Sequence, residues 1–182
     1  MATPEAHGFA SSSRAGVLDV MTKSTYVVFE VAGRSCALAR EHVRRILLLP
    51  MLGRPPGLPS AVEGIIDVAG MAVPVIRLDR LFDLPQKPLH AYQHLILLAG
   101  APPALALLAD RATGVVSVAD GAAVPLPEAE TFNGCVTAQL SSERGPIFVL
   151  SVDRLLTHRE RDALADFQAM ERRRLNELRG AA

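Results

Sequence analysis

Two cysteines and a few histidines are the side chains best suited to nucleophilic chemistry in this chain. Cys36 and Cys135 are the candidate nucleophiles, and a histidine such as His94 would have to act as the base. A working nucleophile needs that base within reach and a third group to orient it. No serine stands in a G-x-S-x-G elbow, and both cysteines lie in apolar, strand-like surroundings, where cysteine behaves as a small buried hydrophobe. We therefore expect no catalytic residue; a small β-barrel enzyme using Cys135 or His94 stays as an alternative.

The pair His90 and His94 has the four-residue spacing of two metal ligands on a helix. The surrounding PLHAYQHL, however, leaves a proline-bearing loop and enters a strand-like run. It also lacks a nearby third ligand for the tetrahedral set that structural zinc needs. The phosphate-binding patterns G-x-x-x-x-G-K-[ST] and G-x-G-x-x-G are absent from the sequence as well. We expect neither a metal nor a cofactor.

The charges of the chain balance. Nineteen basic and nineteen acidic residues give a pI near 7.0, so there is no long-range attraction to phosphate backbones or to anionic lipid. The run Arg172–Arg174 stands among acids such as Glu171 and Glu177, which cancel much of its field. Aromatic residues make up only 4%, too few for a platform that stacks single strands. Nucleic acid is therefore not an expected partner.

The most membrane-like segment runs from Leu95 to Ala109 without a charge. Gly100 and the pair Pro102–Pro103 interrupt it, and a spanning helix needs about 20 apolar residues, so the segment predicts two buried strands around a turn. The first 25 residues lack the basic start and apolar run of an export signal, and two cysteines suit a reducing compartment. We expect a cytoplasmic protein with no direct membrane insertion.

Short apolar runs separated by Gly, Pro and Asp fill the middle of the chain and predict an all-β barrel or sandwich. Pro74 cannot donate a ladder hydrogen bond, so its strand should lie at an edge or carry a bulge. The Gly- and Pro-rich segment 51–59 predicts a connecting loop, and residues 40–43 predict one helical turn. The ten predicted strands are Tyr26–Val31, Ser35–Leu38, Ile46–Leu49, Val62–Val68, Ala72–Leu78, His94–Ala99, Ala104–Leu108, Gly114–Ala119, Cys135–Leu140 and Ile147–Val152.

The hydrophobic period changes after Leu156. Thr157 with Glu160 forms a capping-box signature and Gly180 suits a C-terminal stop, which predicts an amphipathic helix from His158 to Arg179. We therefore divide the chain into a flexible leader (1–24), a barrel domain (25–157) and a C-terminal amphipathic helix extension (158–182).

The proximal part of this helix should pack on a barrel through Leu164 and Phe167. Its distal apolar residues are candidates for an additional partner surface or for contact with a second copy, and packing within the same chain is the alternative. These distal residues are Met170, Leu175 and Leu178.

Four blocks of the sequence resemble the CheW-like family of chemotaxis coupling proteins. TYVVFEVAGRSCALAREHVRRIL resembles the family's opening strands. GLPSAVEGIIDVAGMAVPVIRLDRLF is similar to its signature P-x-x-x-x-G-hydrophobic-x-N-L-R-G-x-hydrophobic-x-P-V-hydrophobic-D-L. ALALLADRATGVV resembles a V-D-x-V-x-x-V block with Asp110 at the aspartate, and GPIFVLSVDRLL resembles the closing strand. On these blocks, in this order, the chain is identified as a divergent member.

The resemblance implies two intertwined SH3-like barrels of five strands each and no catalytic activity. It implies an adaptor that binds the regulatory domain of a CheA-type histidine kinase. It also implies binding of the cytoplasmic tip of chemoreceptors in a groove between the barrels, with recruitment to membrane receptor arrays. Carried over by position, the partner-binding residues would be Val43, Arg45 and Ile46 beside the groove and Ile66, Asp67, Val68, Ala69 and Gly70 at the signature turn.

Three of these positions depart from the family pattern. Ala69 replaces the signature arginine, Asp67 replaces the usual asparagine, and Arg45 stands where an acid is usual. Arg45 could meet Asp67 and restore opposite charges at shifted positions; neutral drift at a solvated turn is the alternative. Because reversed interface charges penalise wrong partners, we interpret the chain as a coupling protein specific for its own kinase or receptor.

The pathway stays open at this stage. The same scaffold in surface motility, pilus control or a second-messenger pathway is the alternative that the altered turn makes plausible. Self-association also stays open.

Overall fold

The computed structural model describes residues 23–100, 104–127 and 134–180, but not the side chains of residues 175 and 178–180. This part contains eleven strands, the helices α1 (Leu78–Leu81) and α2 (His158–Gly180), and the 3-10 turns η1 (Arg40–His42) and η4 (Val152–Arg154). The strands are β1 (Lys23–Val31), β2 (Arg34–Ala39), β3 (Val43–Leu48), β4 (Val62–Val68), β5 (Met71–Arg77), β6 (His94–Leu98), β7 (Ala106–Ala109), β8 (Arg111–Ala119), β9 (Val124–Pro125), β10 (Val136–Ser142) and β11 (Gly145–Leu150).

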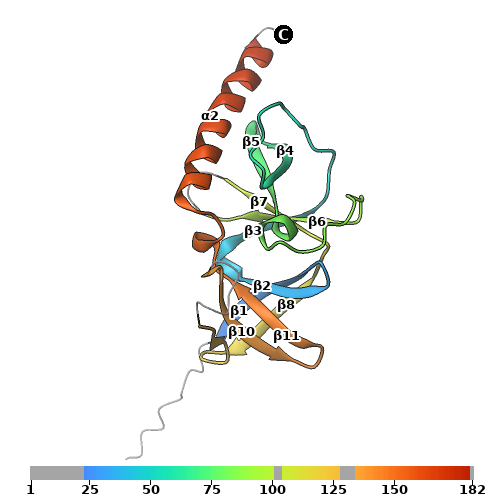
Figure 1. The fold of residues 1–182 in the computed structure, drawn as a ribbon, viewed down its shortest axis with the longest axis vertical. Coiled ribbons are helices and arrows are strands. Elements are labelled where there is room, and N and C mark those ends of the chain that lie inside the picture. Colours follow the sequence, from blue (N-terminus) through green and yellow to red (C-terminus); the bar gives the residue numbers. More distant parts are fainter. Residues whose placement is uncertain (1–22, 101–103, 128–133, 181–182) are drawn as a thin grey trace, which may run out of the picture.

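The strands form two sheets that the chain visits in turn (Figure 1). It starts in a six-stranded sheet of order β8-β1-β2-β11-β10-β9 and crosses through η1 into a five-stranded sheet of order β3-β6-β7-β5-β4. It returns to the first sheet with β8. The all-β fold of two intertwined units with a long C-terminal helix is thus confirmed.

The ten predicted strands are all present, with shifted ends. β3 starts at Val43 rather than Ile46, and β8 starts at Arg111 rather than Gly114. The strand that the sequence did not predict is β9, whose two residues are too few to show alternation. The predicted leader falls mostly outside the described residues, and its last two, Lys23 and Ser24, already belong to β1.

Two hairpins turn on an Ala-Gly pair, as the sequence predicted for β1–β2 and β4–β5. In the second, Ala69 and Gly70 have φ of 51° and 83°, and Val68 pairs with Met71 across a two-residue loop. Positive φ at both loop residues is the signature of a type I′ turn, whose twist matches that of the strands. The alanine therefore occupies a conformation that is costly for any residue with a Cβ.

Pro74 was expected at an edge or a bulge, but β5 lies inside the sheet between β4 and β7. It is tolerated because Ile65, opposite Pro74, exchanges both its backbone bonds with Gly53 on its other side (2.9 and 2.8 Å). The pairing of β5 with β7 begins only at Val75. No ladder bond to the Pro74 nitrogen is required on either side.

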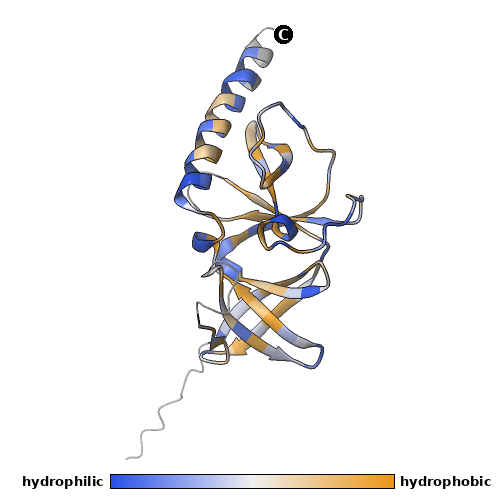
Figure 2. Ribbon diagram, in the orientation of Figure 1, coloured by the Kyte–Doolittle hydropathy of each residue, from blue (hydrophilic) through white to orange (hydrophobic). Residues whose placement is uncertain are grey.

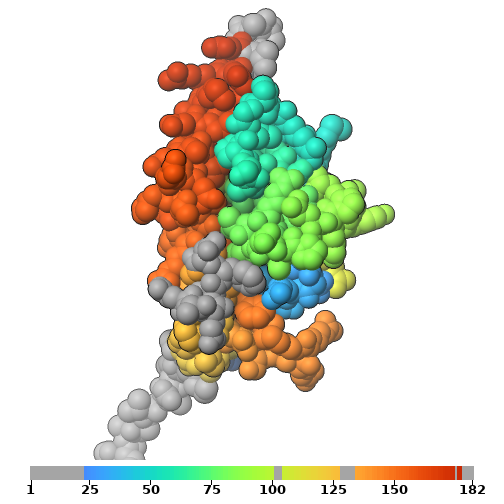
Figure 3. Space-filling view, viewed as in Figure 1, coloured from blue at the N-terminus to red at the C-terminus, as the bar shows by residue number. Residues whose placement is uncertain are grey.

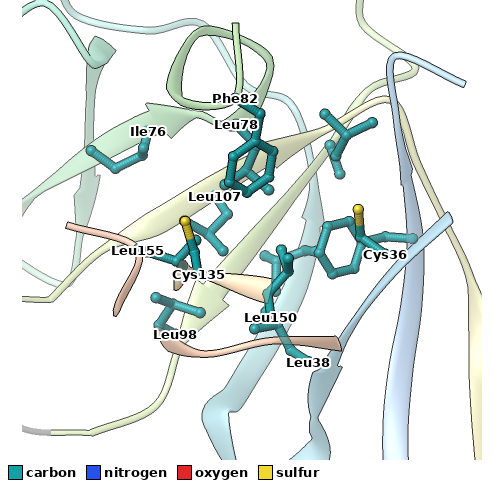
Figure 4. Close-up of a cluster of buried hydrophobic side chains, with 14 of the residues drawn as sticks. Cys36, Leu38, Ile76, Leu78, Phe82, Leu98, Leu107, Cys135, Leu150 and Leu155 are labelled. Atoms are coloured by element: carbon teal, nitrogen blue, oxygen red, sulfur yellow. The ribbon is translucent and has the colours of Figure 1, made fainter. Parts of the chain in front are cut away.

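The largest apolar cluster lies between the two sheets. Figure 4 shows its side chains, among them Leu38 from β2, Leu107 from β7 and Leu150 from β11. A smaller cluster around Val73 and Leu95 belongs to the five-stranded sheet, and one around Val28 belongs to the six-stranded sheet. Because the main cluster draws on strands of both sheets, burial of its apolar surface holds the sheets together.

α2 begins with the predicted capping box. The Glu160 carboxylate accepts the Thr157 N–H at 2.8 Å, and the Thr157 hydroxyl accepts the Glu160 N–H at 3.3 Å. The helix then runs alongside the five-stranded sheet (Figure 1). Leu164 and Phe167 are buried as predicted, while apolar and polar segments alternate along the helix in Figure 2. No helix among the described residues is long and apolar enough to span a membrane.

Candidate partner-binding surface

The predicted partner-binding residues lie on the two edge strands of the five-stranded sheet and on the hairpin between β4 and β5. β3 and β4 stand at opposite ends of the strand order. Arg44 of β3 lines the same cavity as Val68 and Met71, so the two edges face each other where the sheet curls. Of the predicted residues, Val68 lines this cavity, and Arg45 and Ile46 follow Arg44 on β3.

These residues differ in their access to solvent. Val43 and Ile66 are only 4% and 6% exposed and contribute to the apolar clusters beneath the surface. Ile46 is 37% exposed, and Arg45, Asp67 and Ala69 are exposed as well, whereas Val68 and Gly70 are half-buried. A docked protein would meet the second group directly, while Val43 and Ile66 set the positions of their strands.

The β4–β5 turn is fixed from within by Asp67. Its carboxylate accepts the Gly70 N–H at 2.6 Å and so closes the turn. The ion pairs given for the described residues do not include one between Asp67 and Arg45. The aspartate instead organises the backbone, a role for which Asp is well suited.

Close packing requires a glycine at Gly64, the glycine of the signature P-x-x-x-x-G. A Cβ at this position would lie 2.8 Å from the Gly53 carbonyl oxygen and 2.8 Å from the Leu52 Cβ. The loop 51–59 can therefore cross β4 closely, which allows the backbone bonds between Gly53 and Ile65. A larger residue would push the loop away from the edge strand.

A buried ion cluster supports the hairpin from below. Glu63 of β4 is 7% exposed and accepts from Arg77 at 3.4 Å and from Arg80 at 2.6 Å. It also pairs with Arg54, which fastens the loop before β4 to the sheet. Arg77 pairs in addition with Asp79 and donates to the Lys87 carbonyl at 2.9 Å. The sequence gave no signal of this cluster, because its members come from separate segments.

The electrostatics of the cluster favour the charged forms. The hydrogen bond to Asp79 raises the pKa of Arg77, against the opposing effect of burial. Burial alone would raise the pKa of Asp79. The hydrogen bond and the charge of Arg77, with the Arg80 N–H and charge, outweigh it, and the net pKa is lowered. Both partners therefore stay ionised at neutral pH, as a buried pair requires.

The side chains considered for nucleophilic chemistry are placed unfavourably for it. Cys36 and Cys135 are buried free thiols in the cluster between the sheets (Figure 4). Burial raises the pKa of Cys36 to about 12 and also raises that of Cys135, so neither thiol ionises readily at neutral pH. His94 lies on β6, in the other sheet from the β10 strand that follows Cys135.

No group of three or more potential metal-ligating side chains occurs in the described part of the chain. His90 lies in the loop before β6 and its ring is 6.4 Å from that of Tyr92. The Nδ1 atom of His94 is buried and has no hydrogen-bond partner. The two histidines therefore occupy a loop and a strand, and not one face of a helix.

The candidate additional surface on α2 is only partly described. Met170 is 39% exposed, while the side chains of Leu175 and Leu178 lie outside the described set. The sequence did not indicate Gln168, which bonds to the sheet, or Glu171, which is buried and pairs with the exposed Arg174. Their polar types gave no hint of burial.

The described part of the chain thus combines two sheets around a shared apolar core with two buried thiols and an exposed hairpin tip. The chain belongs to the CheW-like family: the family model described as "CheW-like domain" matches residues 25–160. It is accordingly a scaffold protein rather than an enzyme.

Two known proteins support this assignment. The chemotaxis protein CheW of Bacillus subtilis (strain 168) is 26% identical over 110 residues, covering 60% of this chain and 70% of the relative. The crystal structure of the scaffolding protein TtCheW from Thermoanaerobacter tengcongensis superposes with a TM-score of 0.68 at 20% identity. That match covers 75% of this chain and 89% of TtCheW, and it shows that the two share a fold.

Proposed function

We propose that this chain couples a CheA-type histidine kinase to the cytoplasmic tip of a methyl-accepting chemoreceptor without chemistry of its own. The observation that carries the proposal is the match of the paired-barrel domain to the CheW-like family over residues 25–160. The name of the Bacillus subtilis relative, a chemotaxis protein, favours the same pathway. The protein would work on the cytoplasmic side, recruited to membrane receptor arrays.

The contact surface in this proposal is the pair of edge strands with the β4–β5 hairpin. Arg45, Ile46, Asp67, Val68, Ala69 and Gly70 would meet the partners, and Val43 and Ile66 would hold the strands from beneath. Edge strands and turns present backbone groups and side chains that other proteins can bind. The groove between the barrels would take the receptor, and the barrel surface would take the regulatory domain of the kinase.

The proposal is tested by capture from the native lysate with the full chain as bait. We expect a histidine kinase and a methyl-accepting receptor to be retained together, and mass spectrometry identifies them. Ile46→Asp and Ala69→Trp should reduce retention, whereas Val124→Asp, at the far sheet, should leave it unchanged. Retention of neither protein by the unaltered chain would end the proposal.

The same scaffold in surface motility, pilus control or second-messenger control is the second candidate. The changed residues Arg45 and Ala69 favour it, because an altered interface charge selects a different partner. Capture of a kinase without a methyl-accepting receptor, together with motility or pilus proteins, would support this pathway in place of chemotaxis.

Partner specificity is tested by restoring the family's charges. Arg45→Glu together with Ala69→Arg should shift binding toward kinases of other coupling systems and weaken binding to the chain's own kinase. The matched control is Ala69→Asn alone, which relieves the turn without adding a charge. Unchanged preference in the double variant would show that these charges do not select the partner.

A further inference from the structure

The distal half of α2 builds a site with the sheet that the family match does not include. Gln168 and Arg172 lie beyond residue 160, where that match ends. The Gln168 amide donates to the Ala72 carbonyl at 3.2 Å and to the Ala104 carbonyl at 2.7 Å. The helix is therefore tied to β5 and to the segment before β7, and Figure 3 shows it lying against the region of the β4–β5 hairpin.

Between the helix and the sheet lies a cavity of about 160 Å³. Its walls are mainly apolar and come from Val68, Met71, Val73, Leu97 and Leu98. Apolar cavities of about 150 Å³ are large enough to hold a benzene ring. A phenyl group therefore fits by size and by the chemistry of the walls.

The charged part of the lining is cationic, and the amide of Gln168 is its neutral polar group. Arg44 of β3 and Arg172 of α2 both line the cavity and are exposed, and no acidic residue lines it. Neither guanidinium group forms an ion pair or a side-chain hydrogen bond with another described residue. Glu171, next to Arg172 on the helix, is buried and pairs with Arg174 at 2.5 Å.

This arrangement differs from that of the other arginines around the hairpin. Arg54, Arg77 and Arg80 each pair with Glu63 within the fold, and Arg77 pairs with Asp79 as well. Arg44 and Arg172 have no such acidic partner among the described residues and stand beside apolar walls. Guanidinium groups bind carboxylates in a bidentate way and stack on aromatic rings.

We propose that this cavity receives an aromatic side chain flanked by carboxylates, presented by an acidic segment of a partner protein. The phenyl-sized volume selects the ring and the two arginines select its acidic neighbours. The apolar walls and the balanced charge of the chain argue against nucleic acid. The inference rests on the proposed adaptor function and names the chemistry of one contact.

The test is an NMR titration of the ¹⁵N-labelled full chain with a capped peptide, Gly-Glu-Phe-Glu-Gly. We expect saturable shifts centred on Val73, Leu97 and Gln168, and at least a several-fold weaker response to the peptides with Ala for Phe or Gln for Glu. Arg44→Gln and Arg172→Gln should each weaken binding about two- to five-fold. Arg173→Gln, on the same helix but outside the lining, is the matched control and should leave binding unchanged.

A cavity-filling variant, Ala104→Leu, should abolish binding of the peptide while retaining the fold, which the dispersion of the NMR spectrum reports. If the Ala104→Leu variant unfolds, the Arg44→Gln and Arg172→Gln variants alone decide whether the peptide binds at the cavity. Equal binding of the Gln peptide, or equal effects of the Arg172 and Arg173 variants, would overturn the inference. Phenylacetate binding as tightly as the peptide would instead indicate a small-molecule site, and the proposal would fail.

The lysate capture separates this inference from the proposed function. Suppose that Arg44→Gln and Arg172→Gln leave the retention of kinase and receptor unchanged and that the peptide does not bind specifically. The cavity proposal is then removed, and the adaptor function stays intact. Arginine-dependent peptide binding by a chain that captures neither protein removes the adaptor proposal and keeps the cavity.

Discussion

Ala69 stands at the tip of the β4–β5 hairpin with a φ of 51°, a region where a Cβ clashes with the backbone. The Asp67 carboxylate holds the turn through the Gly70 N–H. At this position the family pattern has an arginine, which carries the same backbone cost. The backbone geometry of the tip is therefore maintained by its neighbours.

Replacing Ala69 with Asn should stabilise the fold, because Asn tolerates the left-handed conformation of a type I′ turn. We expect the free energy of unfolding to rise by about 0.5–1 kcal/mol, measured by urea denaturation. Ala122→Asn, in a turn without positive φ at that residue, is the control and should give no comparable gain. A similar change in both variants would show that turn strain is not the cause.

The second prediction concerns the contribution of Asp79 to the free energy of unfolding and its dependence on pH. Its folded pKa lies below the ordinary value of 3.8, so its contribution to stability is present above that pH and is lost as the pH falls through the folded pKa. Asp79→Asn should lower the free energy of unfolding by about 1–3 kcal/mol at pH 7. The difference from the unaltered chain should shrink below pH 3.8.

Denaturation curves from about pH 2.5 to about pH 7 measure this difference, because that range lies on both sides of the ordinary pKa of an aspartate carboxyl. Asp166→Asn, on the exposed face of α2, is the matched control. A difference between Asp79→Asn and the unaltered chain that stays constant down to the lowest pH would contradict the role of the Arg77 pair.

At the scale of elements, the position of α2 is set by local contacts at its start and by contacts with distant segments farther along the helix. Its start is set by the Thr157–Glu160 capping box, and its middle by burial of Leu164 and Phe167. Farther on, Gln168 bonds to the sheet. The helix is therefore a fixed wall of the five-stranded unit, and this rigidity is what a preformed cavity requires.

Removing the N-terminal cap should destabilise the first turn of α2. Thr157→Ala should lower the free energy of unfolding by about 1 kcal/mol, because the Glu160 N–H loses its side-chain acceptor. Thermal or urea unfolding followed by circular dichroism measures the loss. Thr157→Ser keeps the hydroxyl and should remain close to the unaltered chain; an equal loss in both would assign the effect to packing of the methyl group.

At the scale of the whole molecule, the two sheets share one main core. Phe29 of β1 is fully buried in the same cluster as Ile96 of β6 and Leu107 of β7. The chain also crosses between the sheets twice, at η1 and before β8. Neither sheet can expose its side of the core without the other, so we expect them to unfold as one cooperative unit.

Phe29→Ala tests this coupling, since it should cost about 3–5 kcal/mol. Although the substitution lies in the six-stranded sheet, hydrogen exchange should show protection falling in β6 as much as in β1. Val118→Ala, a half-buried change on β8 outside the shared cluster, is a milder comparison in the same sheet. Loss of protection confined to β1, β2 and β8 would show that the sheets are independent.

Much of the fold follows from signals that are close together in the sequence. Short apolar runs between Gly, Pro and Asp predicted ten strands, the Ala-Gly pairs marked two hairpins, and Thr157 with Glu160 marked the start of α2. Family blocks in order then predicted the paired barrels. The strand, hairpin and helix-start signals work because they reflect local backbone preference or the pattern of one strand, whereas the paired barrels were predicted from the family resemblance alone.

Tertiary structure decided the rest, because it joins residues that no local pattern connects. Pro74 is inside the sheet because Ile65 turns its backbone to Gly53, and Arg77 is buried because Glu63 and Asp79 neutralise it. Arg44 and Arg172 come from distant segments and meet at one cavity only when α2 packs on the sheet. The sequence by itself thus determined the elements and the family, whereas long-range packing alone decided which charges are buried and which are paired.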